Sequence, residues 1–502
     1  MEITLNQASI DCYDKLYSQT LRKEETQDSV VPDTMPDIGG IICTSGTVLI
    51  RSKDVGEGRV RIEANVPVKV SYTPEEGEGV YCLELNLPLY AAMEDAQITE
   101  NSLCVADLKL TGLETKVLNP RKVSVRAEAL FSADCYAPGK MTFSGAPEQG
   151  TEGVNVLERT VAVTPVCAVA EKTFVLTDEF TIPAGQPPAA AILSQQTLPQ
   201  IEDVKVAGTK LIVKGSVKSS LLYASEDYTV GSVEFSTGFN QIIETDKEIS
   251  EPYIGVRMLL SGAYYDVNGE GRTGEMELHL VAQAVIHAGA EAVCLADAYS
   301  NRYALQTVTE TLPVERIETE LTLRETLREQ LPTAQGVAEI VQGSYDLGRP
   351  QGEGGAVTLP ITVCMCYRTA DGRLCSAKRT YQVKFSYALE EGQRLAVAGA
   401  SAQELLLTPS AGGAEVRLPL ELRAFLVRTD GISCVTAITC DETGTLDLSE
   451  KPTIVIVRAA SGDDLWLLAK ENGSTVQAIT EANGLDALSA PWERLILIPR
   501  VC

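Results

Sequence analysis

The sequence is poor in the groups that most enzymes use. Histidine occurs twice in 502 residues, at His279 and His287, so a catalytic triad, a histidine metal site or a histidine acid–base pair would have to use one of them. His279 lies in a run that alternates apolar and polar residues, which predicts that its side chain lies on the solvent side of a strand. Phosphate-binding glycine loops and the Gly-x-Ser-x-Gly motif are missing too. We therefore expect no enzyme, with no catalytic residues, no metal site and no cofactor.

Positive charge and long apolar runs are also scarce. The 42 lysines and arginines face 69 acidic residues, for a formal charge of −27. A surface this acidic repels phosphate backbones and anionic lipid. No apolar run approaches the roughly twenty residues of a membrane-spanning helix, and the polar N-terminal segment is unlike a secretory signal. These features predict a cytoplasmic protein with no nucleic-acid binding and no membrane insertion.

The spacing of the cysteines matches no metal-binding or disulfide pattern. The 13 cysteines are odd in number, scattered, and never arranged as Cys-x-x-Cys, so a zinc site is not indicated. We expect reduced and mostly buried thiols that act as small apolar residues. The alternative is cross-linking in a late, oxidising assembly, for which Cys502 is the first candidate.

What the chain does contain is a repeat. An apolar strand ending at tyrosine, a short polar turn and a second alternating strand occur around Tyr72, Tyr223 and Tyr367, at steps of 151 and 144 residues. This pattern is typical of a β-hairpin. Short upstream segments are expected to be partner strands of the hairpins: Val60–Ile62, Leu211–Val213 and Val357–Leu359. Longer alternating strands follow downstream: Val123–Ala127, Met276–Ala284 and Val416–Leu426.

The period of these strands predicts the fold class. Strict alternation of apolar and polar residues gives a strand one buried face and one solvent-exposed face, as in antiparallel sheets. Pro419, inside the third downstream strand, indicates a sheet edge or a bulge. We expect a mainly β protein with three repeated antiparallel β-rich domains over residues 1–150, 151–305 and 306–450, followed by a small βααβ domain over 451–502. The arrangement of the three domains and the role of residues 1–29 stay open.

A proline motif precedes the first copy. Val30–Ile38 reads V-V-P-D-T-M-P-D-I, in which Asp33 and Asp37 are either a working carboxylate pair or turn residues. The later copies repeat proline without these aspartates, so the recurring feature is a rigid, extended entry to the first strand. The aspartates are then turn or cap residues, or a contact of the first domain alone. The prolines that we match, at steps of 151 and 145 residues, are Pro36, Pro187 and Pro332.

The last fifty residues change pattern. Two short amphipathic segments lie between two apolar strands, in the order βααβ. Asp463 or Asp464 is expected to cap the first helix and Gly473 to end it. Ser474 with Gln477 is expected to form a capping box for the second helix. The remaining expected features are strands at Ile454–Ala459 and Leu495–Ile498, a turn at Gly462, and a helix end near Asn483-Gly484.

This tail resembles a LysM module. The family couples G-D-x-L-W, a T-V-x-x-I helix, N-G-L and a strand ending in I-P, and all four occur between Gly462 and Pro499. The sequence departs from the family at Trp492, where glycine usually follows proline. The resemblance implies a shallow groove between two loops that binds N-acetylglucosamine polymers. The implied partner- or glycan-binding residues are Gly462, Asp463, Asp464, Leu465, Asn483, Gly484, Leu485, Asp486 and Trp492.

The chain as a whole resembles the SPOCS-domain spore coat morphogenetic proteins of endospore-forming bacteria. The resemblance rests on the Val30–Ile38 motif, the repeated β-rich domains and the LysM module. It implies a scaffold that is made in the cytoplasm of the mother cell and recruited to the forespore surface. It also implies that the LysM module docks on the coat-assembly ATPase, and that the protein contacts other spore coat proteins.

Two functions remain open at this point. The first is a structural adaptor of the spore coat, and the alternative is a peptidoglycan-binding protein, against which the missing secretory signal counts. Trp466 is explained equally well as a core residue and as a contact residue, whereas Trp492 is expected on the surface as an interface anchor. Unpaired sheet edges also make a homo-oligomer conceivable.

Overall fold

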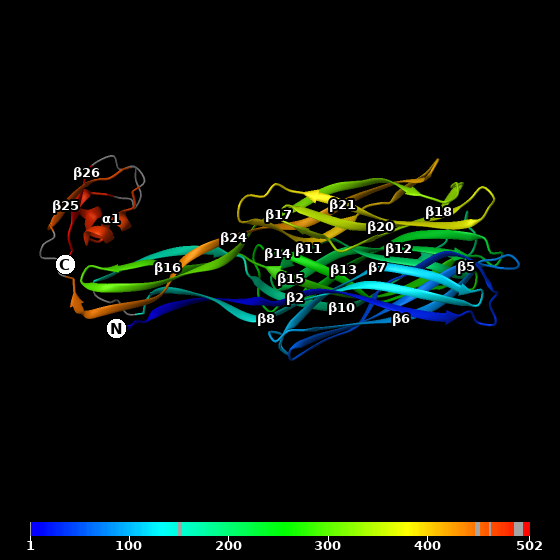
Figure 1. The fold of residues 1–502 in the computed structure, drawn as a ribbon, viewed down its shortest axis with the longest axis horizontal. Helices are drawn as coiled ribbons and strands as arrows, with labels where there is room; N and C mark the ends of the chain where they lie inside the picture. The colour runs from blue at the N-terminus through cyan, green and yellow to red at the C-terminus, as the bar shows by residue number, and fades with distance from the viewer. Residues whose placement is uncertain (1, 149–152, 447–451, 461–462, 486–494, 502) are drawn as a thin grey trace.

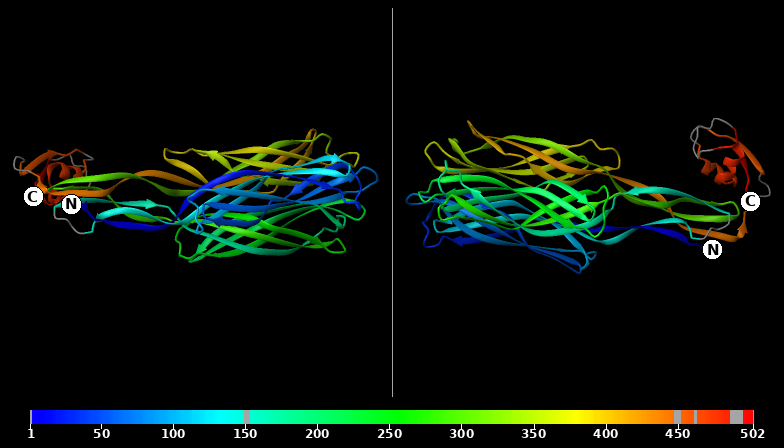
Figure 2. Two further views of the ribbon diagram at one scale, coloured as in Figure 1. Left: turned by 60° about the horizontal axis from the view of Figure 1, so that its bottom comes forward. Right: turned by 180° about the vertical axis from the view of Figure 1, so that it is seen from behind.

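The computed structural model describes residues 2–148, 153–446, 452–460, 463–485 and 495–501. Strand accounts for 74% of the structure and helix for 3%, which confirms the mainly β prediction. Three β units lie side by side in an elongated body (Figures 1 and 2). Long strands leave one end of this body as a stalk, and the C-terminal module sits at the far end of the stalk (Figure 1).

Each unit consists of two antiparallel sheets around its own core. In unit 1 one sheet contains β3 (Ile38–Gly46), β4 (Leu49–Gly56), β5 (Arg59–Pro74) and β6 (Tyr81–Glu94). The other contains β2 (Leu5–Val30), β7 (Leu103–Asn119) and β8 (Lys122–Pro147). In unit 2 the sheets are β11 (Ala191–Ala207), β12 (Lys210–Ala224) and β13 (Val230–Glu244), and β10 (Val166–Thr181), β14 (Tyr253–Val267) and β15 (Thr273–His287).

Unit 3 follows the same plan with more broken strands. One sheet contains β18 (Glu339–Leu347), β19 (Gln351–Glu353), β20 (Ala356–Arg368) and β21 (Leu374–Ser386). The other contains β17 (Tyr303–Pro332), β22 (Gln393–Ala402), β23 (Leu406–Ser410) and β24 (Gly413–Thr445). β24 also pairs with the short N-terminal strand β1 (Glu2–Ile3).

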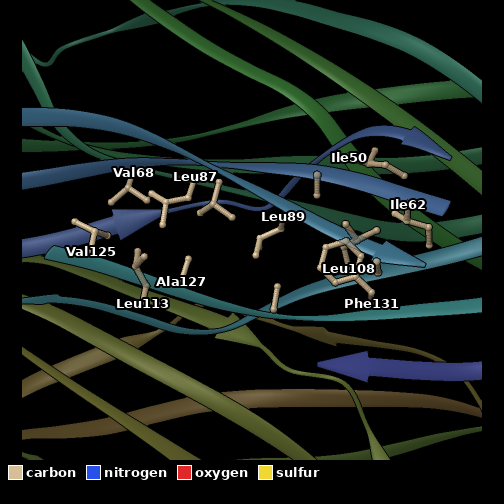
Figure 3. Packing of buried hydrophobic residues seen from close by; sticks show 14 of the residues in the cluster. Ile50, Ile62, Val68, Leu87, Leu89, Leu108, Leu113, Val125, Ala127 and Phe131 are labelled. Atoms are coloured by element: carbon tan, nitrogen blue, oxygen red, sulfur yellow. The ribbon is translucent and has the colours of Figure 1, made fainter. Parts of the chain in front are cut away.

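The alternating sequence patterns produce these cores. In β5 every second residue from Val60 to Val70 is buried, and in β8 the same holds from Val123 to Phe131. The side chains of the two sheets of unit 1 meet between them, as Figure 3 shows for Val68, Leu87 and Phe131. Burial of these apolar side chains is the main stabilising contribution to each unit.

The three tyrosine hairpins form as predicted, but their expected partner strands do not exist separately. Tyr72 faces Tyr81 across the β5–β6 pair, and the β12–β13 and β20–β21 pairs repeat this arrangement. Val60–Ile62 and its two counterparts are the first residues of these same long strands. The alternation extends without a break from the upstream segment to the tyrosine, so no turn separates them.

Pro419 lies in a central strand rather than at an edge. Its carbonyl accepts a hydrogen bond from the Gln403 N–H at 3.0 Å, at the break between β22 and β23. In an antiparallel strand the N–H and C=O of one residue point to the same side. The N–H that proline lacks would therefore point at the interruption between two neighbouring strands, where the ladder has no regular partner.

The stalk is built from the ends of strands that begin in the body. The first part of β2 pairs with the last part of β8, and the first part of β17 with the last part of β24. Two short strands, β9 (Val154–Val163) and β16 (Ala290–Ser300), pair with each other between them. Two apolar clusters fill the stalk, one around Phe143 and Cys434 and one around Leu295 and Ile438.

A closed ring of hydrogen bonds joins the three units. Each unit donates a hydroxyl or thiol from the second strand of its hairpin to a backbone carbonyl of the next unit. The acceptor lies in the strand that pairs with the first strand of that unit's hairpin. The three bonds are Cys82 Sγ to Leu193 O at 3.7 Å, Ser232 Oγ to Val341 O at 2.7 Å, and Ser376 Oγ to Ile42 O at 2.5 Å. The apolar side chains of Ile42, Leu193 and Val341 meet in one cluster at this ring.

Cross-unit contacts also join units 1 and 2 behind the ring. The amide of Gln283 is 1% exposed and pairs with both the N–H and the C=O of Ala106, at 2.8 and 3.0 Å. Arg257 donates to Asp134 at 2.8 Å. Because the units share buried polar contacts as well as apolar ones, they form one body and not a flexible string.

The Val30–Ile38 motif is held by one arginine. Arg121 lies in the turn between β7 and β8 and donates to the carbonyls of Val31, Pro32 and Met35 at 2.8 to 3.0 Å. It also pairs with Asp37 at 2.9 Å and with Asp33 at 3.2 Å. In unit 2, Arg272 donates in the same way to the carbonyls of Pro183 and Gln186. The two aspartates therefore belong to a backbone clamp of the first unit.

The tyrosine of each hairpin holds the same motif from the other side. Tyr72 donates to Pro36 O at 3.0 Å and Tyr223 donates to Pro187 O at 3.1 Å, and Tyr367 interacts with Thr333 and the backbone of Gln335. All three rings are almost fully buried. The hydroxyl therefore fixes the entry segment against the hairpin in every unit.

Our match of Pro332 to the second proline is wrong. Pro332 follows the buried Leu331, just as Pro32 follows Val31 and Pro183 follows Ile182. The position of the second proline is taken by Gln335, because Tyr367 interacts with its backbone as Tyr72 does with the carbonyl of Pro36. Pro332 thus takes the place of the first proline. Spacing alone misled us because the third unit has different loop lengths.

We predict that Arg121 matters more for stability than its two acidic partners. Arg121→Ala removes hydrogen bonds to three carbonyls and should lower the free energy of unfolding by about 2 kcal/mol. The Asp33→Asn/Asp37→Asn variant keeps those bonds and loses only exposed ion pairs, so its melting temperature should hardly change. Urea unfolding of the full chain measures both. A larger loss in the double variant than in Arg121→Ala would contradict the clamp.

Candidate functional site

The C-terminal module has the predicted βααβ order. Its elements are β25 (Ile454–Arg458), α1 (Leu465–Asn472), α2 (Val476–Asn483) and β26 (Leu495–Pro499). β25 and β26 pair antiparallel, and one face of this two-stranded sheet packs on the helices. Ile479, Ile496 and Ala469 are fully buried in that core.

The caps of α1 agree with the sequence prediction. Asp464 is the N-cap, and its carboxylate accepts from the Trp466 N–H at 2.9 Å. Asp463 accepts from the Ala460 N–H at 2.8 Å and so closes the preceding loop. Gly473 ends the helix with φ of 63°, in the left-handed region that glycine adopts without strain. Both aspartates therefore have structural partners.

The cap of α2 differs from the prediction. Thr475, and not Ser474, is the N-cap, and its hydroxyl accepts from the Ala478 N–H at 3.1 Å. Ser474 is fully buried and donates to the carbonyl of Pro499, which ties the start of α2 to the closing strand. The Ser–x–x–Gln spacing is a capping-box signal, but the hydroxyl one residue later has the better position.

The predicted groove residues at the end of α2 also hold the module together. The Asn483 amide donates to Leu497 O at 2.6 Å and accepts from Leu497 N–H at 2.8 Å. Gly484 is the left-handed C-cap with φ of 59°, and Leu485 packs on the core, as does Leu465 at the start of α1. Gly462, Asp486 and Trp492 lie outside the described residues. The binding role of this set stays a prediction.

Trp466 joins the module to the stalk, a contact that we did not foresee. Its indole N–H donates to Asp297 at 2.8 Å, and Lys470 on the next turn of α1 pairs with the same carboxylate at 2.7 Å. The Trp466 ring packs edge-on against Tyr299 with centroids 4.7 Å apart. The Tyr299 hydroxyl donates to Ser474 O at 3.0 Å. Trp466 is thus a core residue of an interface between α1 and β16.

This contact sets the ionisation of the groups within it. Partial burial acts to raise the pKa of Asp297, but the hydrogen bonds from Lys470 and Trp466 outweigh it and hold the pKa below its usual range. Burial and the neighbouring Asp297 raise the pKa of Tyr299 to about 12, so its hydroxyl stays a neutral donor. One ionised carboxylate therefore organises the junction between module and stalk.

The outer face of the two-stranded sheet is apolar and exposed. Ile454, Ile456 and Leu495 keep 55%, 62% and 67% of their surface accessible. They share this face because Ile456 lies opposite Leu497 and Arg458 lies opposite Leu495 in the pairing. The sheet face lies opposite α1 and α2. We did not predict this face as a site, although apolar residues at the outward-facing positions of both strands indicate it.

Groups with catalytic potential are not concentrated anywhere in the described part of the chain. His279 lies on the half-exposed face of β15, as predicted, and pairs with Glu277 at 2.6 Å. No group of three or more His, Cys, Asp or Glu residues that could hold a metal ion occurs among the described residues. Nor does any helix described here have the length and apolar character to cross a membrane. The twelve described cysteines are thiols, seven of them buried.

Comparison with known families agrees with the two resemblances. The model described as SipL, SPOCS domain, matches residues 188–257, which run from the proline motif of unit 2 to the start of β14. The LysM model matches residues 458–490. The chain contains a SPOCS domain and a C-terminal LysM domain. Searches of curated proteins and of solved structures found no match.

These two domains define the broad class of the protein. SPOCS and LysM are binding or scaffold domains, and their combination fits a sporulation-related protein with a peptidoglycan-binding type of module. The SPOCS match covers β11, β12 and β13, the sheet of unit 2 that takes part in the ring. The LysM match covers α1 and α2, and α1 is the helix that contacts the stalk.

We predict that the junction between the LysM domain and the stalk weakens in acid. A carboxylate whose pKa is lower in the folded than in the unfolded state stabilises the contact above its usual pKa of about 3.9. That contribution is lost as the pH falls through the lower, folded value. The indole N–H resonance of Trp466 should therefore shift below about pH 4. Asp297→Asn should already show the shifted resonance at pH 7, and an unchanged wild-type position in that variant would refute the role of Asp297.

Proposed function

We propose that the protein is a non-enzymatic structural adaptor in endospore coat assembly, whose LysM domain docks on the coat-assembly ATPase at the forespore surface. The observation that carries this proposal is the exposed apolar face of β25 and β26. Exposed aliphatic side chains gathered on one sheet suit a protein partner better than a sugar chain, which needs hydrogen-bonding groups and aromatic faces. The stalk holds the LysM domain at a distance from the body (Figure 1).

The body supports the scaffold role. We propose that all three units are SPOCS-like repeats, within residues 1–150, 151–305 and 306–450, with the LysM domain in 451–502. The support is the repeated pair of sheets, the tyrosine that holds the proline segment, and the ring that uses equivalent positions in each unit. Three large sheet surfaces offer docking area for other spore coat proteins. On this proposal the protein works in the mother-cell cytoplasm and gathers on the forespore.

Peptidoglycan binding is the second candidate, because LysM domains are known for it and the family match covers both helices. The groove would lie between the loops at Gly462–Leu465 and Asn483–Asp486, with Trp492 as an additional stacking surface. The amide of Asn483 is already engaged with β26, so binding there would depend on backbone groups and on the residues around it. N-acetylglucosamine polymers are the expected ligand in this case.

Charge reversal on the sheet face separates the two candidates. In the full chain, Ile456→Glu/Leu495→Glu should abolish capture of the purified coat ATPase, since it would place two carboxylates in an apolar interface. Retention on insoluble peptidoglycan should not change, because the groove is untouched. Val308→Glu is the matched control: Val308 is 54% exposed on the stalk strand β17 and lies outside the LysM domain.

Two results would overturn the docking proposal. One is ATPase capture at wild-type level by the sheet-face variant. The other is saturable binding of the wild type to peptidoglycan without any binding to the ATPase, lost on Trp492→Ala. Circular dichroism on each variant checks that the change has not unfolded the domain, since β25 and β26 contribute Val455, Val457, Ile496 and Ile498 to its core.

A further inference from the structure

A cavity of about 600 Å³ lies where the three units meet. Its wall includes Cys43, Ser194 and Gln342, each of which directly follows a carbonyl acceptor of the ring. All three units therefore contribute equivalent strands, β3, β11 and β18, to the wall. This volume is within the roughly 300 to 1,000 Å³ of sites for small molecules in proteins.

The charge of the wall is opposite to that of the protein. The described lining contains five cationic side chains and two acidic ones, whereas the chain carries −27 overall. Arg257 and Arg423 are paired with Asp134 and Glu320 outside the lining, both at 2.8 Å. The remaining cations are Lys109, Arg349 and Lys378, and the acids are Asp107 and Asp346.

Two of these cations have no partner of their own. Within the part of the chain that the structure describes, neither Lys109 nor Lys378 forms an ion pair or a side-chain hydrogen bond. Lys109 belongs to unit 1 and Lys378 to unit 3, and both act electrostatically on Asp346. Lys109 is half-buried and Lys378 is exposed, so both ammonium groups are accessible to a ligand in the cavity. An anion placed between them would be attracted by both charges and would link units 1 and 3.

The environment of the Asp346 carboxyl group shows that it faces the cavity. Its side chain keeps accessible surface, yet loss of bulk solvent raises the pKa of its carboxyl group above the usual value, against the influence of Lys378, Gln196 and Lys109. Both observations hold together when the carboxyl group faces water inside the cavity rather than bulk solvent. Gln196 from unit 2 donates to it at 3.4 Å, so residues of all three units converge on this point.

We propose that the cavity is a binding site for a small dianionic oxyanion, such as inorganic phosphate or a short dicarboxylate, which Lys109 and Lys378 hold between units 1 and 3. Polar groups of unit 2, including Gln196, complete the set of donors. The bound anion cross-links the body at the centre of the ring. This site is separate from the LysM domain and does not depend on its partner.

Calorimetry and thermal unfolding of the full chain test the site with inorganic phosphate and with succinate as probes. We expect saturable binding of at least one of them, and a rise in melting temperature beyond that from sodium chloride at equal ionic strength. Lys109→Met/Lys378→Met should weaken binding by about a hundredfold, because each of the two lost charge-assisted hydrogen bonds corresponds to about tenfold. The single variant Lys378→Gln should show an intermediate loss.

Lys116→Met/Lys210→Met is the matched control, since these two exposed lysines lie on β7 and β12 and do not line the cavity. It removes the same net charge and should bind as the wild type does. The proposal is overturned if neither probe binds saturably, or if the control loses as much affinity as the cavity variant. Phosphate binding without succinate binding would narrow the ligand to phosphate compounds.

Discussion

The architecture depends on the three hydrogen bonds that close the ring of units. Each bond uses a side chain of one unit and a backbone carbonyl of the next, so no unit can leave without exposing an unpaired carbonyl and an apolar cluster. A ring of three heterologous contacts is the single-chain counterpart of a cyclic trimer. It explains why a chain of this length forms one elongated body, with the strand ends free to continue into a stalk. The carbonyl of Leu193 also accepts from the buried Ser71 hydroxyl of unit 1 at 2.7 Å. Gln283 and Arg257 add further contacts at that same boundary between units 1 and 2.

The stalk follows from the same constraint. Both termini of each unit leave at one end of the body. The strands β2, β8, β17 and β24 continue beyond the sheets of the body. Their extensions pair with one another instead of ending in loops, which buries apolar side chains such as Phe143 and Ile438 outside the body. The LysM domain then rests on β16 through Trp466 and Asp297. The contacts of Trp466 and Lys470 with Asp297 therefore hold the LysM domain on the end of the stalk.

Local features of this fold were readable from the sequence, and contacts between distant residues were not. Alternation predicted the hairpins at Tyr72, Tyr223 and Tyr367, and glycine and aspartate predicted the ends of α1. The contact of Trp466 with Asp297 spans 169 residues, and no local pattern encodes it. The ring escaped notice because Cys82, Ser232 and Ser376 are equivalent by spacing but not by residue type. Pro332 was misplaced because burial, which the sequence does not show, identifies the equivalent residue.

The distribution of polar groups connects the body with the proposed role. A scaffold must keep its sheets from associating indiscriminately, and the high negative charge provides that repulsion between copies. The apolar face of β25 and β26 has no acidic residue among its described positions, and it carries Arg458 opposite Leu495. An acidic protein with an exposed, largely apolar sheet face at the end of a stalk can select a partner there while its body repels other copies of itself. Specificity then comes from the position of the face, and the ring and the stalk fix that position.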